Sequence, residues 1–229
     1  MTEFYLIPTW FFGFSSLLEL FFGLITLGVA LYAFYVNRFC DEREIKLFGY
    51  GFLAIALSYF SWAFVNWYVP FKASIQEEIF RFNNYEMLVS LGVYAHVFLF
   101  LIGLVTLVFL TMMREGNRLY SLLVILSFLI IVFSEQKIIS FYFVSSLLLF
   151  YMIYHYGREF YEEGGKHNAL MLLAFIFLFI ASVDFTFSAI NHIHFVAGHI
   201  LFLIGYLFIL FNLVLMVKPF LRKQKQKNG

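Results

Sequence analysis

Long apolar runs follow one another along almost the whole chain. A helix needs about 20 consecutive apolar residues to cross the hydrocarbon core of a bilayer. Seven segments meet or approach this length, at residues 10–36, 47–69, 88–113, 119–134, 138–156, 169–188 and 195–217. The chain is 63% hydrophobic and 13% charged, whereas soluble domains are about 45–50% apolar and about 25% charged. The sequence therefore predicts an all-α, seven-helix integral membrane protein.

Lysine and arginine are distributed unevenly between the connecting segments. If the N-terminus lies outside the cell, twelve of the 15 lysines and arginines lie on the cytoplasmic side, and only Lys72, Arg81 and Lys137 lie outside. Positive charge is retained on the cytoplasmic side of membranes. We therefore expect a multi-pass protein of the cell membrane with its N-terminus outside and its C-terminus inside. Residues 1–217 would form one transmembrane domain, and residues 218–229 a basic cytoplasmic tail.

Two blocks of three segments resemble each other. The second segment contains FLAIALS ending at Ser58, and the sixth contains IFLFIAS ending at Ser182. The third segment contains HVFLFLIG from His96, and the seventh contains HILFLIG from His199. Matching order and direction predict a parallel internal repeat of 3+1+3 helices, in which residues 119–134 connect the blocks.

This 3+1+3 plan resembles the architecture of SWEET sugar transporters and, more loosely, that of microbial rhodopsins. The resemblance is one of topology only. The segments contain no Pro-Gln pair of the kind that marks SWEET helices, and the last segment has no lysine to which retinal could attach. No functional residue is therefore carried over from either family.

Only two of the 14 acidic residues fall inside apolar segments, Glu19 and Asp184. A charged residue at the centre of a bilayer costs roughly 2.5–3.5 kcal/mol on insertion scales, and such residues usually face the interior of a bundle. Glu19 must therefore be protonated, paired or exposed to a wet cavity.

The polar residues within the segments lie at similar depths. At about 1.5 Å per helical residue, Glu19 and His96 lie roughly 14 and 12 Å below the outer ends of their segments, and Asp184 and His199 lie roughly 6 Å below theirs. Asn66 is near the outer end of the second segment, close to Trp62. We therefore predict a ligand-binding pocket in the outer half of the membrane. Its lining would be Glu19, Trp62, Asn66, His96, Asp184 and His199.

His96, Asp184 and His199 also have the ligand chemistry of a zinc site. A zinc-bound water would be activated for hydrolysis, with Glu19 as the base. Seven-helix zinc hydrolases of the alkaline ceramidase and adiponectin-receptor type carry an HxxxH pattern in the last span, which this chain lacks. Haem held between His96 and His199 is a further alternative for the cofactor.

Three functions stay open from the sequence. The leading hypothesis is a bundle that binds or transports a small polar solute, a proton or a metal ion through the outer-half pocket. The alternatives are a metal-dependent hydrolase that acts on lipid and a non-catalytic subunit or sensor of a membrane complex. The expected partners are the lipid bilayer and either other membrane proteins or further copies of the chain. A net charge of +1 gives no reason to expect nucleic acid.

Overall fold

A computed structural model describes residues 11–40, 42–75, 82–112 and 117–227 of the chain. Within these ranges the chain is helical, with seven α-helices, one short 3-10 helix and no strand. The elements are α1 (Phe12–Cys40), α2 (Arg43–Ile75), α3 (Phe82–Thr111), α4 (Asn117–Phe133), α5 (Lys137–Glu163), α6 (Lys166–Thr186), η1 (Phe187–Ala189) and α7 (His192–Lys227).

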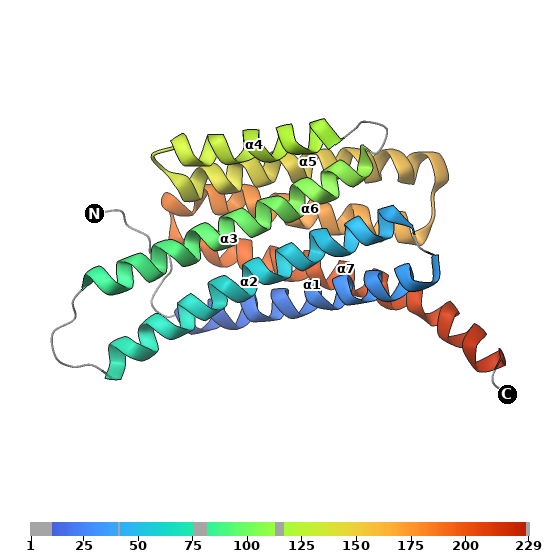
Figure 1. The fold of residues 1–229 in the computed structure, drawn as a ribbon, viewed down its shortest axis with the longest axis horizontal. Helices are drawn as coiled ribbons and strands as arrows, with labels where there is room; N and C mark the ends of the chain where they lie inside the picture. The colour runs from blue at the N-terminus through green and yellow to red at the C-terminus, as the bar shows by residue number, and fades with distance from the viewer. Residues whose placement is uncertain (1–10, 41, 76–81, 113–116, 228–229) are drawn as a thin grey trace.

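The long helices run side by side along the length of the molecule (Figure 1). All α-helices except α4 are long and apolar enough to cross a membrane, and the apolar part of α4, Leu119–Phe133, is shorter. A helix satisfies its backbone hydrogen bonds internally, as the water-free core of a bilayer requires. The chain is therefore a multi-pass membrane bundle, and the predicted all-α class is confirmed.

Large apolar side chains cover much of the outer surface of the bundle. Examples on three helices are Leu17, Leu122 and Phe150, each more than half exposed. Such a surface is unfavourable in water, where large exposed apolar patches promote association. It suits contact with lipid chains, which are as apolar as leucine.

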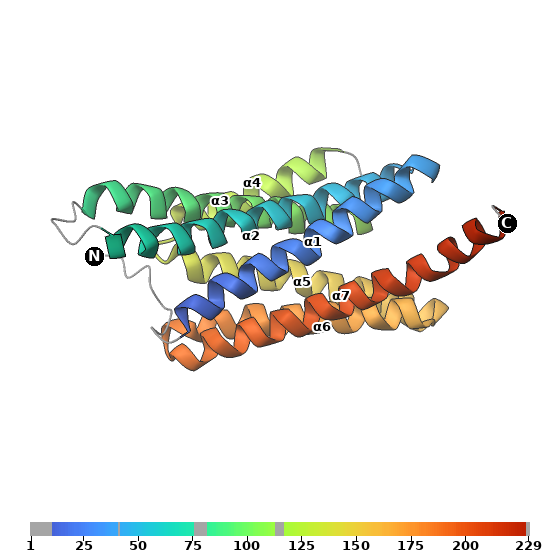
Figure 2. The same cartoon turned by 90° about the horizontal axis from the view of Figure 1, so that it is seen from below.

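The helices pack as two groups of three, with α4 outside both. One group contains α1, α2 and α3, and the other contains α5, α6 and α7. The groups meet where α1 packs on α7 and where α3 packs on α5, while α4 lies against α3 and α5. Figure 2 shows one group above the other, with α4 at the edge of the upper group. The interface between the groups is thus the central axis of the bundle.

Glycines set the closest helix contacts in both groups. A Cβ atom placed on Gly103 of α3 would lie 2.7 Å from the carbonyl oxygen of Gly51 and 2.5 Å from Ile55. A Cβ atom placed on Gly205 of α7 would lie 2.8 Å from Leu178 of α6. Small residues allow helix backbones to approach closely in membranes, where no hydrophobic force drives helices together.

Two helices extend beyond the apolar segments predicted for them. α2 continues through Pro70 to Ile75, and α7 continues to Lys227. The predicted boundary between the membrane domain and the basic tail at residue 217 therefore falls inside one continuous helix. By contrast, α5 and α6 are separated by a tight turn at Gly164 and Gly165, whose φ angles of 66° and 95° favour glycine.

Candidate functional site

A small cavity lies between the two helix groups, near the end of the bundle at which α1 and α7 begin. Its volume is about 50 Å³, and one water molecule requires about 10–15 Å³ on this measure. Side chains from α1, α2, α3, α5, α6, η1 and α7 line it. The polar lining residues are Glu19, Tyr59, Trp62, His96, Tyr142, Ser188 and His199. We call this space the Glu19 cavity; it has room for a few water molecules.

Glu19 projects from α1 about two turns after the helix begins and is 3% exposed. The Nδ2 atom of Asn66 on α2 donates a hydrogen bond of 2.9 Å to its Oε2 atom. Trp62, whose indole N–H can only donate, is a further hydrogen-bonding partner of the same carboxyl group. Two donors from α2 therefore hold the carboxyl group, while its Oε1 atom faces α7.

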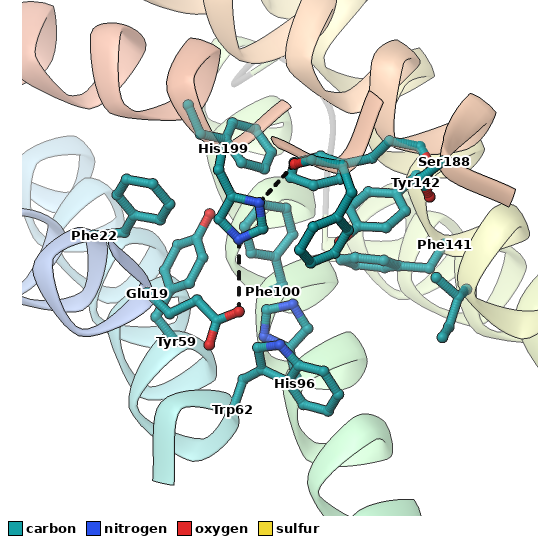
Figure 3. Close-up of a pocket in the computed structure, with 14 residues that line it drawn as sticks. Glu19, Phe22, Tyr59, Trp62, His96, Phe100, Phe141, Tyr142, Ser188 and His199 are labelled. Atoms are coloured by element: carbon teal, nitrogen blue, oxygen red, sulfur yellow. Dashed lines mark hydrogen bonds and ion pairs between the residues drawn. The ribbon is translucent and has the colours of Figure 1, made fainter. Parts of the chain in front are cut away.

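His199 on α7 meets Glu19 across the interface between the helix groups. Its Nε2 atom lies 3.7 Å from Oε1 of Glu19, and Figure 3 shows the two groups pointing toward each other. The Nδ1 atom lies 2.9 Å from the carbonyl oxygen of Phe195. Because a carbonyl oxygen only accepts, Nδ1 carries a hydrogen. Nδ1 is therefore occupied by the backbone, and Nε2 is the ring nitrogen that is left to face Glu19.

The contact between Glu19 and His199 would be eased by a single proton. With no proton on either group, a carboxylate oxygen would face the lone pair of Nε2, which is electrostatically unfavourable at low dielectric. A proton on the carboxyl group or on the imidazole removes this conflict. The distance of 3.7 Å exceeds the usual limit of about 3.2 Å for a direct hydrogen bond. A small shift of either side chain, or one bridging water, would close the gap.

Aromatic rings enclose His199. The ring centroids of Phe11, Phe22, Phe185 and Phe195 lie 5.4, 6.3, 5.0 and 4.5 Å from that of the imidazole. These rings keep bulk water from the pair. Electrostatic interactions in such a place are stronger than in water, and an unpaired charge is correspondingly costly.

His96 on α3 is held to α2 by a second set of hydrogen bonds. Its Nδ1 atom lies 2.7 Å from Oγ of Ser58 and 3.2 Å from the Ser58 carbonyl oxygen. The Ser58 hydroxyl donates to the carbonyl oxygen of His96 at 3.1 Å. Nδ1 therefore donates to Ser58 and carries the hydrogen, so Nε2 is the basic nitrogen. Both histidines of the cavity thus have the same fixed tautomer.

A tyrosine pair links the two groups next to the cavity. The hydroxyl groups of Tyr59 on α2 and Tyr206 on α7 lie 2.8 Å apart, and both side chains are buried. Tyr59 lines the Glu19 cavity, and Tyr206 lies farther along the bundle axis. Separating the groups at this level would break the hydrogen bond.

The structure brings most of the predicted site residues together. Glu19, Trp62, His96 and His199 line the cavity, and Asn66 bonds to Glu19. Sequence reasoning missed Tyr59, Tyr142 and Ser188 as lining residues. A signal for the first was available, because Tyr59, Trp62 and Asn66 are spaced by three and four residues along α2. This spacing places them on one helix face.

Asp184 does not join this cavity. Its Oδ1 atom lies 2.6 Å from Nδ1 of His194, at the other side of the turn between α6 and α7. The neighbouring Phe185 does line the cavity, and successive helical residues point about 100° apart. Among the described residues, no group of three or more His, Cys, Asp or Glu side chains is arranged to hold a metal ion. The zinc site predicted from His96, Asp184 and His199 is therefore not assembled.

The chain matches no protein-family model, and comparisons with curated proteins and with solved structures found no match.

Proposed function

We propose that this protein is a membrane transporter in which Glu19 and His199 share an exchangeable proton. The main support for this proposal is that a buried carboxyl group faces a buried imidazole across the interface between the two helix groups. Ionisable groups inside membrane bundles commonly mark ion pathways and proton relays.

The size of the Glu19 cavity favours a proton over a larger solute at this position. About 50 Å³ has room for water molecules and a proton, whereas drug-sized ligands occupy pockets of about 300–1,000 Å³. Its described lining includes one carboxyl group and two imidazoles but neither lysine nor arginine. Carboxyl and imidazole groups are the side chains that form proton relays in membrane pumps and transporters.

The position of the pair favours transport over static binding. In transporters built from internal repeats, the site lies at the interface between the repeats, and movement of one repeat against the other exposes it to each side in turn. The glycine contacts support such a repeat. Gly103 packs against Gly51 and Ile55, and Gly205 packs against Ala174 and Leu178, so each glycine meets residues spaced by four. With the N-terminus outside, the Glu19 cavity lies in the outer half of the membrane.

Infrared difference spectroscopy tests the proposal on purified protein in lipid nanodiscs. A protonated carboxyl group absorbs separately from a carboxylate, so a pH change that titrates Glu19 changes the carboxyl band. We expect this signal in the wild type and its loss in Glu19→Gln. Asp184→Asn is the matched control, because it removes a carboxyl group outside the cavity and leaves the Glu19 signal in place.

Persistence of the complete carboxyl signal in Glu19→Gln would overturn the proposal. Transport is measured separately, in proteoliposomes that contain a pH-sensitive dye. Under an imposed pH gradient, the wild type should move protons faster than Glu19→Gln, and Asp184→Asn should match the wild type.

A further inference from the structure

A second, larger cavity occupies the opposite end of the same interface between the helix groups. Its volume is about 330 Å³, and residues of all six helices of the two groups line it. The polar lining residues are Tyr32, Glu44, Tyr156, His167, Asn168 and Asn212. The remaining lining side chains are apolar. We call this space the Glu44 cavity; its volume falls within the range of about 300–1,000 Å³ that is common for small-molecule sites.

A hydrogen bond between α6 and α7 forms one wall of this cavity. Nδ1 of His167 lies 2.8 Å from Oδ1 of Asn212, and because that oxygen only accepts, His167 donates. Asn212 is 3% exposed and is the one strongly polar side chain in the last eighteen residues of the apolar run that ends at Val217. Asn212 is not part of the proposed proton site at Glu19. An inward-facing amide with a fixed orientation is typical of a polar group that orients a ligand.

The charge of the lining favours a cation. Glu44 is the single formally charged residue among the described lining residues, which include neither lysine nor arginine. The neighbouring Arg43 lines a different hollow, beside Tyr50 and Tyr120. Tyr32 and Tyr156 also line the cavity, and aromatic rings attract ammonium groups. Most of the other lining residues are apolar, which favours a cation whose charged group is attached to an apolar group.

An apolar layer separates the two cavities. It surrounds a space of about 10 Å³, no more than the ~10–15 Å³ that one water molecule requires. Phe100 and Phe202 belong both to this layer and to the lining of the Glu19 cavity, and Ile209 belongs both to the layer and to the lining of the Glu44 cavity. The three spaces therefore lie in series along one axis, with the layer closed.

We propose that the Glu44 cavity binds a small organic cation with an apolar body, such as a quaternary amine, on a path that leads to Glu19. The continuation of the path to Glu19 rests on the proposed function, whereas cation binding beside Glu44 does not. In this conformation the Glu19 cavity, at about 50 Å³, is too small for such a cation. The cation would therefore bind beside Glu44 first and would approach Glu19 only after the apolar layer and the Glu19 cavity had widened.

Isothermal titration calorimetry on the full chain in lipid nanodiscs tests this site. The probe is benzyltrimethylammonium, which carries a permanent charge on an aromatic body. Benzylsulfonate is the control ligand, with the same ring and the opposite charge. We expect benzyltrimethylammonium to bind and benzylsulfonate not to bind. Removal of the Glu44 charge by Glu44→Gln should weaken the cation about tenfold, as expected for the loss of one partly solvated charge interaction.

Glu42→Gln is the matched variant. It makes the same change two residues away, at an exposed position that does not line the cavity, and should leave the affinity unchanged. The inference is overturned if benzyltrimethylammonium does not bind, if both ligands bind equally, or if Glu44→Gln and Glu42→Gln have the same affinity. The infrared signal of Glu19 is recorded in the same nanodiscs without the cation, so failure of the cation site and failure of the proton site are distinguishable.

Discussion

The two cavities lie on the same axis but differ in size, enclosure and charge placement. The Glu19 cavity has about 50 Å³ and a carboxyl group that is 3% exposed and held by donors from α2. The Glu44 cavity has about 330 Å³ and an exposed carboxylate in the first turn of α2. The positive end of a helix dipole stabilises a carboxylate in that turn. The Glu19 carboxyl group is therefore enclosed by the bundle, whereas the Glu44 carboxylate lies at its surface.

The difference in width between the two cavities also suits one end state of the proposed transport path. The Glu44 cavity lies toward the end of the bundle where α7 carries its basic residues. The apolar layer of aromatic rings and leucines separates the Glu19 cavity from it. A single static pore would show comparable width along its length. The two helix groups thus leave more space between them at one end than at the other, which is the asymmetry that the proposed rocking movement would need in each of its end states.

Thiol labelling gives the largest expected effect and tests the difference in access. In a Cys40→Ser background, Ala33→Cys places a thiol in the Glu44 cavity, and Leu104→Cys places one in the apolar layer. A charged methanethiosulfonate reagent should modify the first at least about 100-fold faster, because a thiol buried among apolar groups is inert. Equal labelling rates, measured by mass spectrometry, would show that the layer is not closed.

The close contact between Gly103 and Gly51, beside the apolar layer, predicts the second largest effect, a loss of stability. Gly103→Ala should destabilise the protein by about 2–3 kcal/mol, because the new methyl group meets the Gly51 backbone, and overpacking typically costs about 1–3 kcal/mol. Gly28→Ala is the control, since a Cβ there meets no atom within 4 Å. Unfolding in mixed detergent, followed by circular dichroism, compares the two. A similar midpoint for both variants would contradict the close contact.

At Glu19, an amide should preserve the stability of the protein better than an apolar side chain. Glu19→Leu leaves the buried Asn66 donor without its acceptor, which should cost about 2 kcal/mol, within the ~1–3 kcal/mol range for an unsatisfied buried group. Glu19→Gln keeps an acceptor oxygen and should lose less. The same unfolding assay ranks the two variants, and a more stable Leu variant would argue against the observed hydrogen bond.

The smallest expected effect concerns the tyrosine pair that spans the two groups. Tyr206→Phe removes the hydrogen bond of 2.8 Å to Tyr59 and should cost about 1 kcal/mol, the usual net value of a buried hydrogen bond. Tyr154→Phe, at a position that is 64% exposed, should change stability by less than about 0.5 kcal/mol. If both variants unfold at the same detergent concentration, the pair does not help to close the interface.

Helix number was predictable because the signal for a membrane span is long and simple. Seven predicted segments correspond to seven helices, although α4 is shorter than the other six. Helix ends were less predictable. Apolar composition marks where a helix is buried in lipid, while α2 and α7 continue as helices beyond that region. Composition says nothing about the end of a helix in the polar part of the membrane or in water.

The candidate site was predictable in depth but not in rotation. Glu19, Asn66 and His199 meet because their similar depths coincide with favourable rotations. Asp184 has a suitable depth, but its side chain turns to His194. A single polar residue on an almost uniformly apolar helix does not show which face points inward, whereas the spacing of Tyr59, Trp62 and Asn66 marks one face of α2. Tyr59 was not predicted to line the site, because it is one of 15 tyrosines in the chain and tyrosine is commonly found at the interface of a membrane.

The backbone carbonyl bonds of the two histidines limit the direction of proton movement. In both rings Nδ1 is occupied by a donated hydrogen bond, so a proton that arrives at Nε2 has to leave by the same nitrogen. A chain of such rings cannot conduct, because conduction needs each ring to receive on one side and release on the other. In the proposed proton exchange, each imidazole would therefore receive and release its proton at Nε2 alone. The destination of that proton would depend on the group that faces Nε2.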